Sequence, residues 1–328
     1  MEILQVAPSD TDGVRRLVAV TNAARAVDAP WVHPTTEHAC AGELRWGWDG
    51  EPATAYLATV GGVDVGAARY ETSTYDNLHL AWLEVEVVPT QRRRGHGSAL
   101  LACLIERARA DGRTTVGAAS WDAAAPVALA DRLGFEQRAV EVHRRQYVAD
   151  LDRAALDELH ADALPHAADY ELVRWLSRTA TDDLGALAGL TAAINDAPND
   201  DLDVEDEVFT PDRIAAYERA WAERGHRLRR VVARHRHTGE LAGQSVVAVD
   251  GERPELAEQH DTSVVGAHRG HRLGLLLKLE VLRWLAEAEP QVREIDTWNA
   301  ESNGHMIGVN ELLGYRVMER VLDFQRSV

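Results

Sequence analysis

Two stretches decide the fold: VVPTQRRRGHGSALL (Val87–Leu101) and VVGAHRGHRLGLLLK (Val264–Lys278). Each has a β-branched strand end, then a turn containing basic residues and glycine, then the apolar start of a helix. The N–H groups of such a turn and the positive end of the helix dipole together form a site for an anion such as phosphate. Two such stretches in corresponding places predict two copies of one phosphate-binding module.

The two copies stay in register along the chain. Arg92 and Gly97 pair with Arg269 and Gly274 at an offset of 177 (269 − 92 = 177). The same offset pairs Ser120-Trp121-Asp122 with Thr297-Trp298-Asn299, and an offset of 180 pairs Leu133-Gly134-Phe135 with Leu313-Gly314-Tyr315. Three landmarks in the same order indicate a duplicated domain.

Composition limits the class of protein. The chain has 328 residues, of which 45% are hydrophobic, and this suits two domains with a core each. The formal net charge of −18 disfavours nucleic acids and anionic membranes as partners and allows a cationic small substrate, although an acidic surface also simply favours solubility. No apolar run predicts a transmembrane helix, and no secretory signal is found. Cys40 and Cys103 lack metal-type spacing. We therefore expect a cytoplasmic monomer or homodimer.

Hydrophobic periodicity predicts similar orders of strands and helices in the two halves. In the first half we expect strands over 2–6, 55–60, 65–72, 80–88, 115–119 and 135–147, helices over 10–27, 98–111 and 126–133, and an irregular segment over 28–48. In the second half we expect strands over 170–175, 229–235, 243–250, 262–265, 294–297 and 315–325, and helices over 182–196, 211–224, 275–289 and 306–313. The predicted domains are residues 1–150 and 170–328, joined by a linker over 151–169.

Both halves resemble the GNAT N-acetyltransferases. In that family a strand ending in a V-x-P-like segment leads to an R/Q-x-x-G-x-G/A turn and a helix, and the turn binds the pyrophosphate of acetyl-CoA. The first half carries the whole pattern in Val87–Gly97, whereas the second half, Val264–Gly274, has Arg272 in place of the first glycine. The later L-G-[FY] also fits twice. The resemblance implies an α/β (α+β) fold of two GNAT-like domains, each a twisted, mixed, mostly antiparallel sheet flanked by helices.

The resemblance also implies acetyl-CoA as co-substrate and assigns its contacts. In the first half they are Val87, Val88, Arg92, Arg93, Arg94, Gly95, His96, Gly97 and Ser98. In the second half they are Val264, Val265, Arg269, Gly270, His271, Arg272, Leu273, Gly274 and Asn303. Asn303 would lie beside the pantetheine arm, or serve as a plain helix N-cap. A backbone N–H near Val87 or Val88, or near Val264 or Val265, would stabilise the developing oxyanion.

Transfer to an amine needs a base, because a lysine-like amine has a pKa of about 10.4 and arrives protonated. In the family this base is commonly a carboxylate on the strand before the turn. Glu84 and Glu86 share one face of that strand, and Asp261 aligns with Glu84 in the second half. Each could equally face solvent or pair with an arginine. The family's tyrosine acid, four residues before the L-G-[FY] glycine, is replaced by Ala130 and Asn310.

Other polar and aromatic segments suggest where the acceptor binds. By resemblance, the loop NDDLDVEDE (Asn199–Glu207) borders the acceptor pocket of the second half, where it could hold a polycationic amine or remain a solvated acidic loop. In the first half the corresponding region holds Trp31, His33, Trp46 and Trp48, which either line a pocket or pack. His235 and His237 have no further ligands nearby in sequence, so no metal site is predicted.

The leading hypothesis is an acetyl-CoA-dependent N-acetyltransferase that acts on a small amine by direct transfer with a general base. One alternative is acyl transfer like that of mycothiol synthase, which the two-domain plan supports. Another is a non-catalytic sensor or scaffold that binds acyl-CoA, which the missing tyrosines motivate. The sequence leaves open which half is catalytic, which group protonates the CoA thiolate and which amine is acetylated.

Overall fold

A computed structural model describes all of residues 1–328, which form two compact units. Unit 1 contains Met1–Glu141, Asn199–Asp206 and Glu319–Val328, and unit 2 contains Val142–Pro198 and Glu207–Met318. The predicted domains are continuous stretches of sequence, whereas each unit gathers separate segments. None of the helices combines the length and the apolar character needed to span a bilayer.

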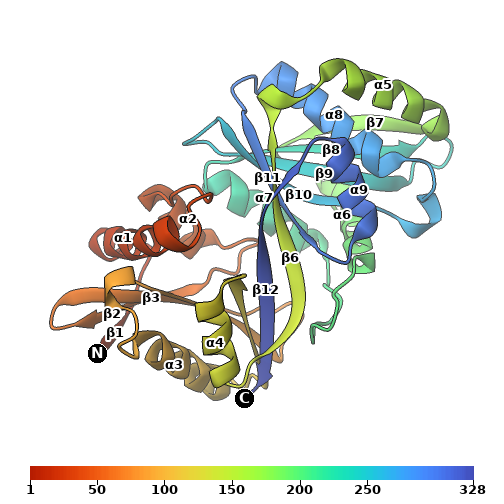
Figure 1. The fold of residues 1–328 in the computed structure, drawn as a ribbon. Coiled ribbons are helices and arrows are strands. Elements are labelled where there is room, and N and C mark those ends of the chain that lie inside the picture. The colour runs from red at the N-terminus through yellow and green to blue at the C-terminus, as the bar shows by residue number, and fades with distance from the viewer. The chain divides into compact units, whose positions relative to one another are not determined.

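Unit 1 is a sheet with helices on both faces (Figure 1). Its strands follow the order β1-β2-β3-β4-β5-β12-β6, in which β4 and β5 are parallel. Helices α1 and α2 cover one face, and α3 and α4 pack on the other. Its elements are β1 (Glu2–Val6), α1 (Thr11–Asp28), α2 (Glu37–Trp46), β2 (Thr54–Val60), β3 (Val63–Glu71), β4 (Leu80–Val87), α3 (His96–Ala110), β5 (Thr115–Trp121), α4 (Ala124–Arg132) and parts of β6 (Glu136–Tyr147) and β12 (Arg316–Ser327).

Unit 2 repeats this plan with the order β6-β11-β10-β9-β8-β7. Helices α5 and α8 and the later α9 join one core, whereas α6 and α7 contribute to separate clusters with β8 and β9. Its own elements are α5 (Arg153–Ala163), β7 (Tyr170–Leu176), α6 (Leu184–Thr191), α7 (Pro211–Glu223), β8 (Arg227–His235), β9 (Leu241–Val249), β10 (Leu256–Val264), α8 (Leu273–Ala288), β11 (Glu294–Ala300) and α9 (Gly304–Leu312).

The ends of β6 and β12 each belong to the unit that is formed mainly by the other half of the sequence. Strand β12 pairs antiparallel with β5 from Val321↔Trp121 to Ser327↔Thr115, so the last residues of the chain complete unit 1. Residues from Val142 onward in β6 belong to unit 2, beside β11. Strands β6 and β12 correspond at the offset of 180, so the two copies have exchanged equivalent strand ends.

The structure corrects three expectations from the sequence. The segment predicted to be irregular contains α2, because Thr36 caps the helix and Cys40 and Leu44, one turn apart, are buried. Strand β10 begins at Leu256 instead of 262, since a bulge between Gln259 and Thr262 hides the alternation. Residues 199–206 of the acidic loop, predicted as part of the second domain, belong to unit 1.

The predicted linker is a structured part of unit 2. It contains α5, which is capped by Asp152, and its Leu156 and Leu159 pack on the main core of that unit. The stretch predicted as a linker therefore contains a packed helix.

Candidate active site

In both units the two parallel strands separate at the end that leads into the turn. Strands β4 and β5 pair from Leu80↔Thr115 to Leu83↔Ala118, and beyond Leu83 β4 pairs only with β3. In unit 2 the pairing of β10 with β11 ends at Glu258↔Asp296. The last residues of β4 and β10 therefore leave one edge of their backbone without a strand partner.

Two backbone N–H groups in each unit were predicted as oxyanion donors, and only one of the two faces this open edge. The N–H of Val88 donates to the carbonyl of Val65, and that of Val265 donates to Ala242, so both are engaged by the neighbouring strand. In an antiparallel pair successive residues face opposite edges. The N–H groups of Val87 and Val264 therefore face the open edge and remain the candidate donors.

The turn of unit 1 has the backbone that an anion site needs. Arg93 and Gly95 have φ values of 63° and 87°, and Gly95 precedes α3 as its N-cap. The backbone N–H groups of residues 93–98 make no hydrogen bond within the chain. Six unpartnered donors at a helix N-terminus suit the pyrophosphate of a CoA molecule.

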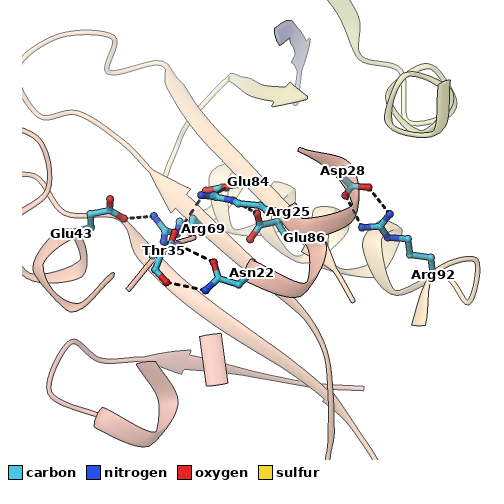
Figure 2. A network of polar contacts seen from close by, with 9 residues as sticks. All are labelled: Asn22, Arg25, Asp28, Thr35, Glu43, Arg69, Glu84, Glu86 and Arg92. Carbon is cyan, nitrogen blue, oxygen red and sulfur yellow. Dashed lines mark hydrogen bonds and ion pairs between the residues drawn. The ribbon is translucent and has the colours of Figure 1, made fainter. Parts of the chain in front are cut away.

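The side chains of this turn have two different uses. Arg92 points back into the protein: its Nε donates to the carbonyl of Val87 at 3.0 Å, and its two Nη atoms bind Asp28 at 2.7 and 2.6 Å. Figure 2 shows this pair beside the end of α1. This differs from the prediction that placed Arg92 among the cofactor contacts. Arg93 and Arg94 are exposed and form no ion pair, so they are the cations available to a phosphate.

The turn of unit 2 keeps the same backbone with glycine at the other position. Gly270 has a φ of 86° and Arg272 a φ of 56°, and they align with Arg93 and Gly95. An arginine therefore adopts the left-handed conformation that glycine adopts in unit 1, at a cost of about 1–2 kcal/mol.

The basic side chains of the second turn are already bound within unit 2. Arg269 donates to Asp196 and to the carbonyl of Val264, which repeats the contacts of Arg92. Arg272 pairs with Asp162 of α5, and His271 bonds the carbonyl of His166. The carboxylate of Asp162 thus neutralises the cation nearest the N-terminus of α8. Only the turn of unit 1 has arginines, Arg93 and Arg94, that form no ion pair.

The candidate bases of unit 1 lie in an ionic network under α1. Arg25 binds Glu84 at 2.8 Å and Glu86 at 2.7 Å, and Arg69 lies 3.7 Å from Glu84 (Figure 2). Of the two interpretations of these carboxylates, an ion pair with an arginine is the one observed. Burial and the neighbouring Glu84 raise the pKa of Glu86, and Arg25 opposes the rise. The side chain of Glu84 is the more accessible, at 42% exposed against 15% for Glu86.

The same network positions the loop after α1. Asn22 donates to the carbonyl of Thr35 and accepts from its N–H, both at 2.9 Å, and Asp28 ends α1 (Figure 2). Beyond Asp28 the loop carries Trp31, whose ring meets Trp121 of β5 edge-on with centroids 5.6 Å apart. Of the aromatic residues predicted near the acceptor, Trp31 is thus brought to the end of β5.

The candidate base of unit 2 has a different environment. Asp261 lies within the bulge of β10, and burial raises its pKa while Arg230 opposes the rise. The preceding His260 bonds the hydroxyl of Tyr217 through Nδ1 at 2.6 Å. Asp261 therefore has no counterpart of the Arg25 pair that holds Glu84 and Glu86.

Asn310, at the position of the family's tyrosine acid, contacts Lys278, a residue that was not predicted from the sequence. Asn310 accepts from Nζ of Lys278 at 2.7 Å and donates to Asn299 at 2.7 Å. Lys278 is buried, and burial lowers its pKa to about 7. The signal in the sequence was a single lysine within the apolar run LGLLLKLEVL.

Asn303 and the histidine pair have local roles in the structure. The side chain of Asn303 caps α9 by accepting from the N–H of Met306 at 3.2 Å. His235 bonds the hydroxyl of Thr238 in the turn that follows β8. Helix capping was one of the two interpretations of Asn303, and it is the contact seen here.

Comparison with known proteins places this geometry in a family. A sequence model described as "Acetyltransferase (GNAT) family" matches residues 21–135, which include the split strands β4 and β5, the turn and α4. A solved tandem GNAT protein from the clavulanic acid biosynthesis pathway superposes with a TM-score of 0.81 at 28% identity, covering 99% of this chain and 98% of its own. Residues 21–135 therefore match the GNAT family, and the whole chain has the fold of a tandem GNAT protein.

Two other relatives extend the comparison. The GCN5-related N-acetyltransferase of Sphaerobacter thermophilus has the same fold, with a TM-score of 0.68 at 15% identity over 99% of this chain and 95% of that one. The mycothiol acetyltransferase of Stackebrandtia nassauensis is 38% identical over 108 residues, which are 32% of this chain and about a third (34%) of that protein. The chain therefore shares its fold with GNAT proteins over nearly its whole length.

Proposed function

We propose that unit 1 transfers the acetyl group of acetyl-CoA to a small amine, and that unit 2 retains the fold without binding acetyl-CoA in the same way. The observation that carries this proposal is the difference between the two turns. Both turns leave the backbone N–H groups before the helix unpartnered, but Arg93 and Arg94 of the first form no ion pair, whereas Arg272 of the second is bound to Asp162.

The residues of unit 1 fit the parts of acetyl-CoA in order along the open edge. The N–H groups of residues 93–98 would hold the pyrophosphate, with Arg93 and Arg94 adding charge-assisted contacts. The N–H of Val87 would donate to the thioester oxygen, where negative charge develops. Bound acetyl-CoA supplies the activated acyl group.

The acceptor would bind on the α1 side of β4. Glu84 and Glu86 lie there, and their ion pairs with Arg25 keep them oriented. Position 130 is an alanine, so another group or water would protonate the departing thiolate in unit 1. An acceptor like that of the mycothiol acetyltransferase is a second candidate, and the 38% identity over 108 residues favours it.

A matched pair of substitutions tests which turn binds the cofactor. Gly97 and Gly274 occupy the same helical position, and a Cβ at either meets no atom closer than 3.5 Å. Gly97→Trp should abolish acetyl-CoA binding by calorimetry, whereas Gly274→Trp should leave one equivalent bound at unchanged affinity. Loss of binding in Gly274→Trp alone, or two equivalents in the wild type, would contradict the assignment.

Thiol release across a panel of primary amines then tests the reaction. We expect the wild type to release CoA in step with amine acetylation, and Gly97→Trp to release none. Tight binding of acetyl-CoA without release for any amine, mycothiol-related amines included, would instead support a sensor or scaffold.

A further inference from the structure

A buried carboxylate from the last strand lies on the acceptor side of unit 1. Asp323 of β12 is directly opposite Ala119 of β5, and the side chain of Asp323 is 6% exposed. Its carboxylate has no hydrogen bond and no cation beside it. Burial of a carboxylate without a partner is unfavourable, so its retention in this position needs a reason.

The strand register puts Asp323 in the same transverse row as Glu84. The last parallel pair is Leu83↔Ala118, so Glu84 is level with Ala119, which is level with Asp323. Residues level with one another share a face of the sheet. Strand spacing separates the Cα atoms of Glu84 and Asp323 by about 10 Å or more. The two carboxylates therefore lie on the strands on either side of β5, and Glu84 borders the split between β4 and β5.

The face between them is open to a ligand. Ala119 is exposed although its strand lies inside the sheet, and its methyl group fills little space. Trp121 follows two residues later on the same face, and Trp31 packs edge-on against it. Aromatic rings beside carboxylates are the surroundings in which proteins bind organic ammonium groups.

The charges around Asp323 are all negative. Glu141 of β6 and Asp200 of the acidic loop are the charged groups that act on it, and together with burial they raise its pKa to about 7. Burial also raises the pKa of Glu141. No group of three histidine, cysteine or acidic side chains in the chain converges as a metal site would. An organic cation is thus the ligand class that these carboxylates suit.

Unit 2 has a titratable side chain at the corresponding position. His143 of β6 aligns with Asp323 at the offset of 180, and it is 1% exposed. Its ring stacks on Trp298, the counterpart of Trp121, and its Nε2 lies 3.3 Å from Asp296. Both exchanged strand ends therefore bring a titratable group to a tryptophan at the end of the split strand.

We propose that Asp323, with Glu141 and Asp200 around it, binds the ammonium group of the acceptor amine in unit 1 and accepts its proton. The proposal rests on acetyl transfer in unit 1 and names the chemical class of the acceptor, a primary amine that arrives as a cation. One N–H bond of the ammonium breaks, the proton joins the carboxylate, and the nitrogen keeps the electron pair with which it attacks. Solvent then removes the proton from Asp323.

Binding tests the site without requiring turnover. Thermal unfolding at pH 8 would be followed with methylammonium, benzylammonium and spermidine as probes, in the wild type, in Asp323→Asn and in the exposed control Asp131→Asn. At least one probe should raise the melting temperature of the wild type and of Asp131→Asn, and raise that of Asp323→Asn much less. Equal shifts in all three proteins, or no shift with any probe, would overturn the site.

Kinetics separates a base from a structural residue. Benzylamine is protonated at pH 7 and needs a base, whereas aniline is already neutral. We expect Asp323→Asn to lower kcat/KM for benzylamine about 100-fold and that for aniline less than about 3-fold, since general bases typically contribute 10²- to 10⁴-fold. The acid limb of the benzylamine pH profile should also move upward, to the pKa of the amine itself, because only neutral benzylamine can then react. Equal losses for the two amines would overturn the proton-transfer role.

The two measurements also separate failure of this site from failure of the proposed function. If benzylammonium stabilises the wild type but not Asp323→Asn, and no amine causes CoA release, the ammonium site stands and acetyl transfer fails. If the wild type and Asp323→Asn acetylate benzylamine equally well, acetyl transfer stands and the role of Asp323 fails.

Discussion

The guanidinium of Arg92 donates hydrogen bonds to both carboxylate oxygens of Asp28, at 2.7 and 2.6 Å, while its Nε donates to the carbonyl of Val87. This single side chain joins the end of β4 to the last residue of α1. Arg269 makes the same two kinds of contact, to Val264 and Asp196. The first arginine of each turn therefore positions the turn against the preceding helix.

The first prediction concerns this positioning role. Arg92→Lys removes the bidentate geometry while keeping the charge, because an ammonium group cannot match the fork of a guanidinium. We expect the Kd for acetyl-CoA, measured by calorimetry, to rise about tenfold. Unfolding by urea should show a loss of about 1 kcal/mol, typical of such a pair. Asp28→Asn should reproduce both effects, and the double variant should add little more. Additive effects would show that the two residues act separately.

The second prediction concerns the free cations of the first turn. Arg93→Ala and Arg94→Ala should each weaken acetyl-CoA binding about threefold to tenfold, as expected for charge-assisted contacts to phosphate. Binding by the double variant should depend less on salt concentration, since fewer charges are screened. Arg272→Ala is the matched control in unit 2 and should bind as the wild type does. A weaker affinity in that control would place acetyl-CoA in the second turn.

The third prediction concerns glycine, which occupies the second left-handed position in the first turn (Gly95) and the first in the second turn (Gly270). Gly95→Ala forces a side chain onto a φ of 87°, although open space surrounds its Cβ, and should destabilise unit 1 by about 1 kcal/mol. Arg272→Gly relieves the same conformation in unit 2 and loses only its exposed pair with Asp162, so it should be neutral or stabilising. Urea unfolding of both variants measures the difference. A destabilised Arg272→Gly would mean that the ion pair outweighs the backbone strain.

The fourth prediction is the pH dependence due to Asp323. Its pKa is about 7 in the folded chain and about 3.9 in an unfolded one, so between these values the folded state binds more protons. Stability due to this group therefore falls as the pH rises from about 4 to 7, and is lowest above 7. Asp323→Asn should stabilise the protein at pH 8 by up to on the order of 4 kcal/mol, and hardly at all at pH 4.

Thermal or urea unfolding across this pH range checks the trend, and Asp131→Asn, an exposed carboxylate in the same unit, should show none of it. A stabilisation that does not change with pH would show that the charge of Asp323 is not the cause.

The fifth prediction has the opposite sign and concerns unit 2. The pKa of Lys278 is about 7 when folded and about 10.4 when unfolded, so between these values the unfolded state binds more protons and stability rises with pH. Lys278→Met should stabilise unit 2 near pH 6 by on the order of 2 kcal/mol, after allowing for the donor that Asn310 loses. The gain should vanish, or turn into a loss, near pH 10. A constant effect over this range would place the amine of Lys278 in contact with solvent.

Periodicity and motif spacing predicted most elements of both units, because they depend on local sequence. Strand β4, α3 and the L-G-[FY] turn lie within a few residues of their predicted positions, since β-branched runs, glycine turns and apolar helix faces act locally. Helix α2 was missed because the segment 28–48 around it is rich in tryptophan, histidine and proline, which is typical of a loop. Strand β10 was predicted too short because polar residues interrupt it at the bulge.

The parts of the candidate site that lie close together in sequence could be predicted. The turn residues and the carboxylates of β4 are close in sequence, so the motif placed them together. Their partners are distant: Arg25 meets Glu84 from α1, and Asp28 meets Arg92 across the turn. Asp323 alternates with apolar neighbours in a strand, which predicts exposure, whereas the structure buries it between strands from other segments.

By itself, the sequence determined that this chain holds two copies of one α/β module and that the first has the intact phosphate turn. Glycine positions and apolar periodicity decide these features through backbone conformation and local burial. Only the tertiary structure decided which cations are free, because ion pairs form between residues far apart in the chain. It also decided that the last strand and the acidic loop complete unit 1, since strand pairing depends on register in space and not on order in the sequence.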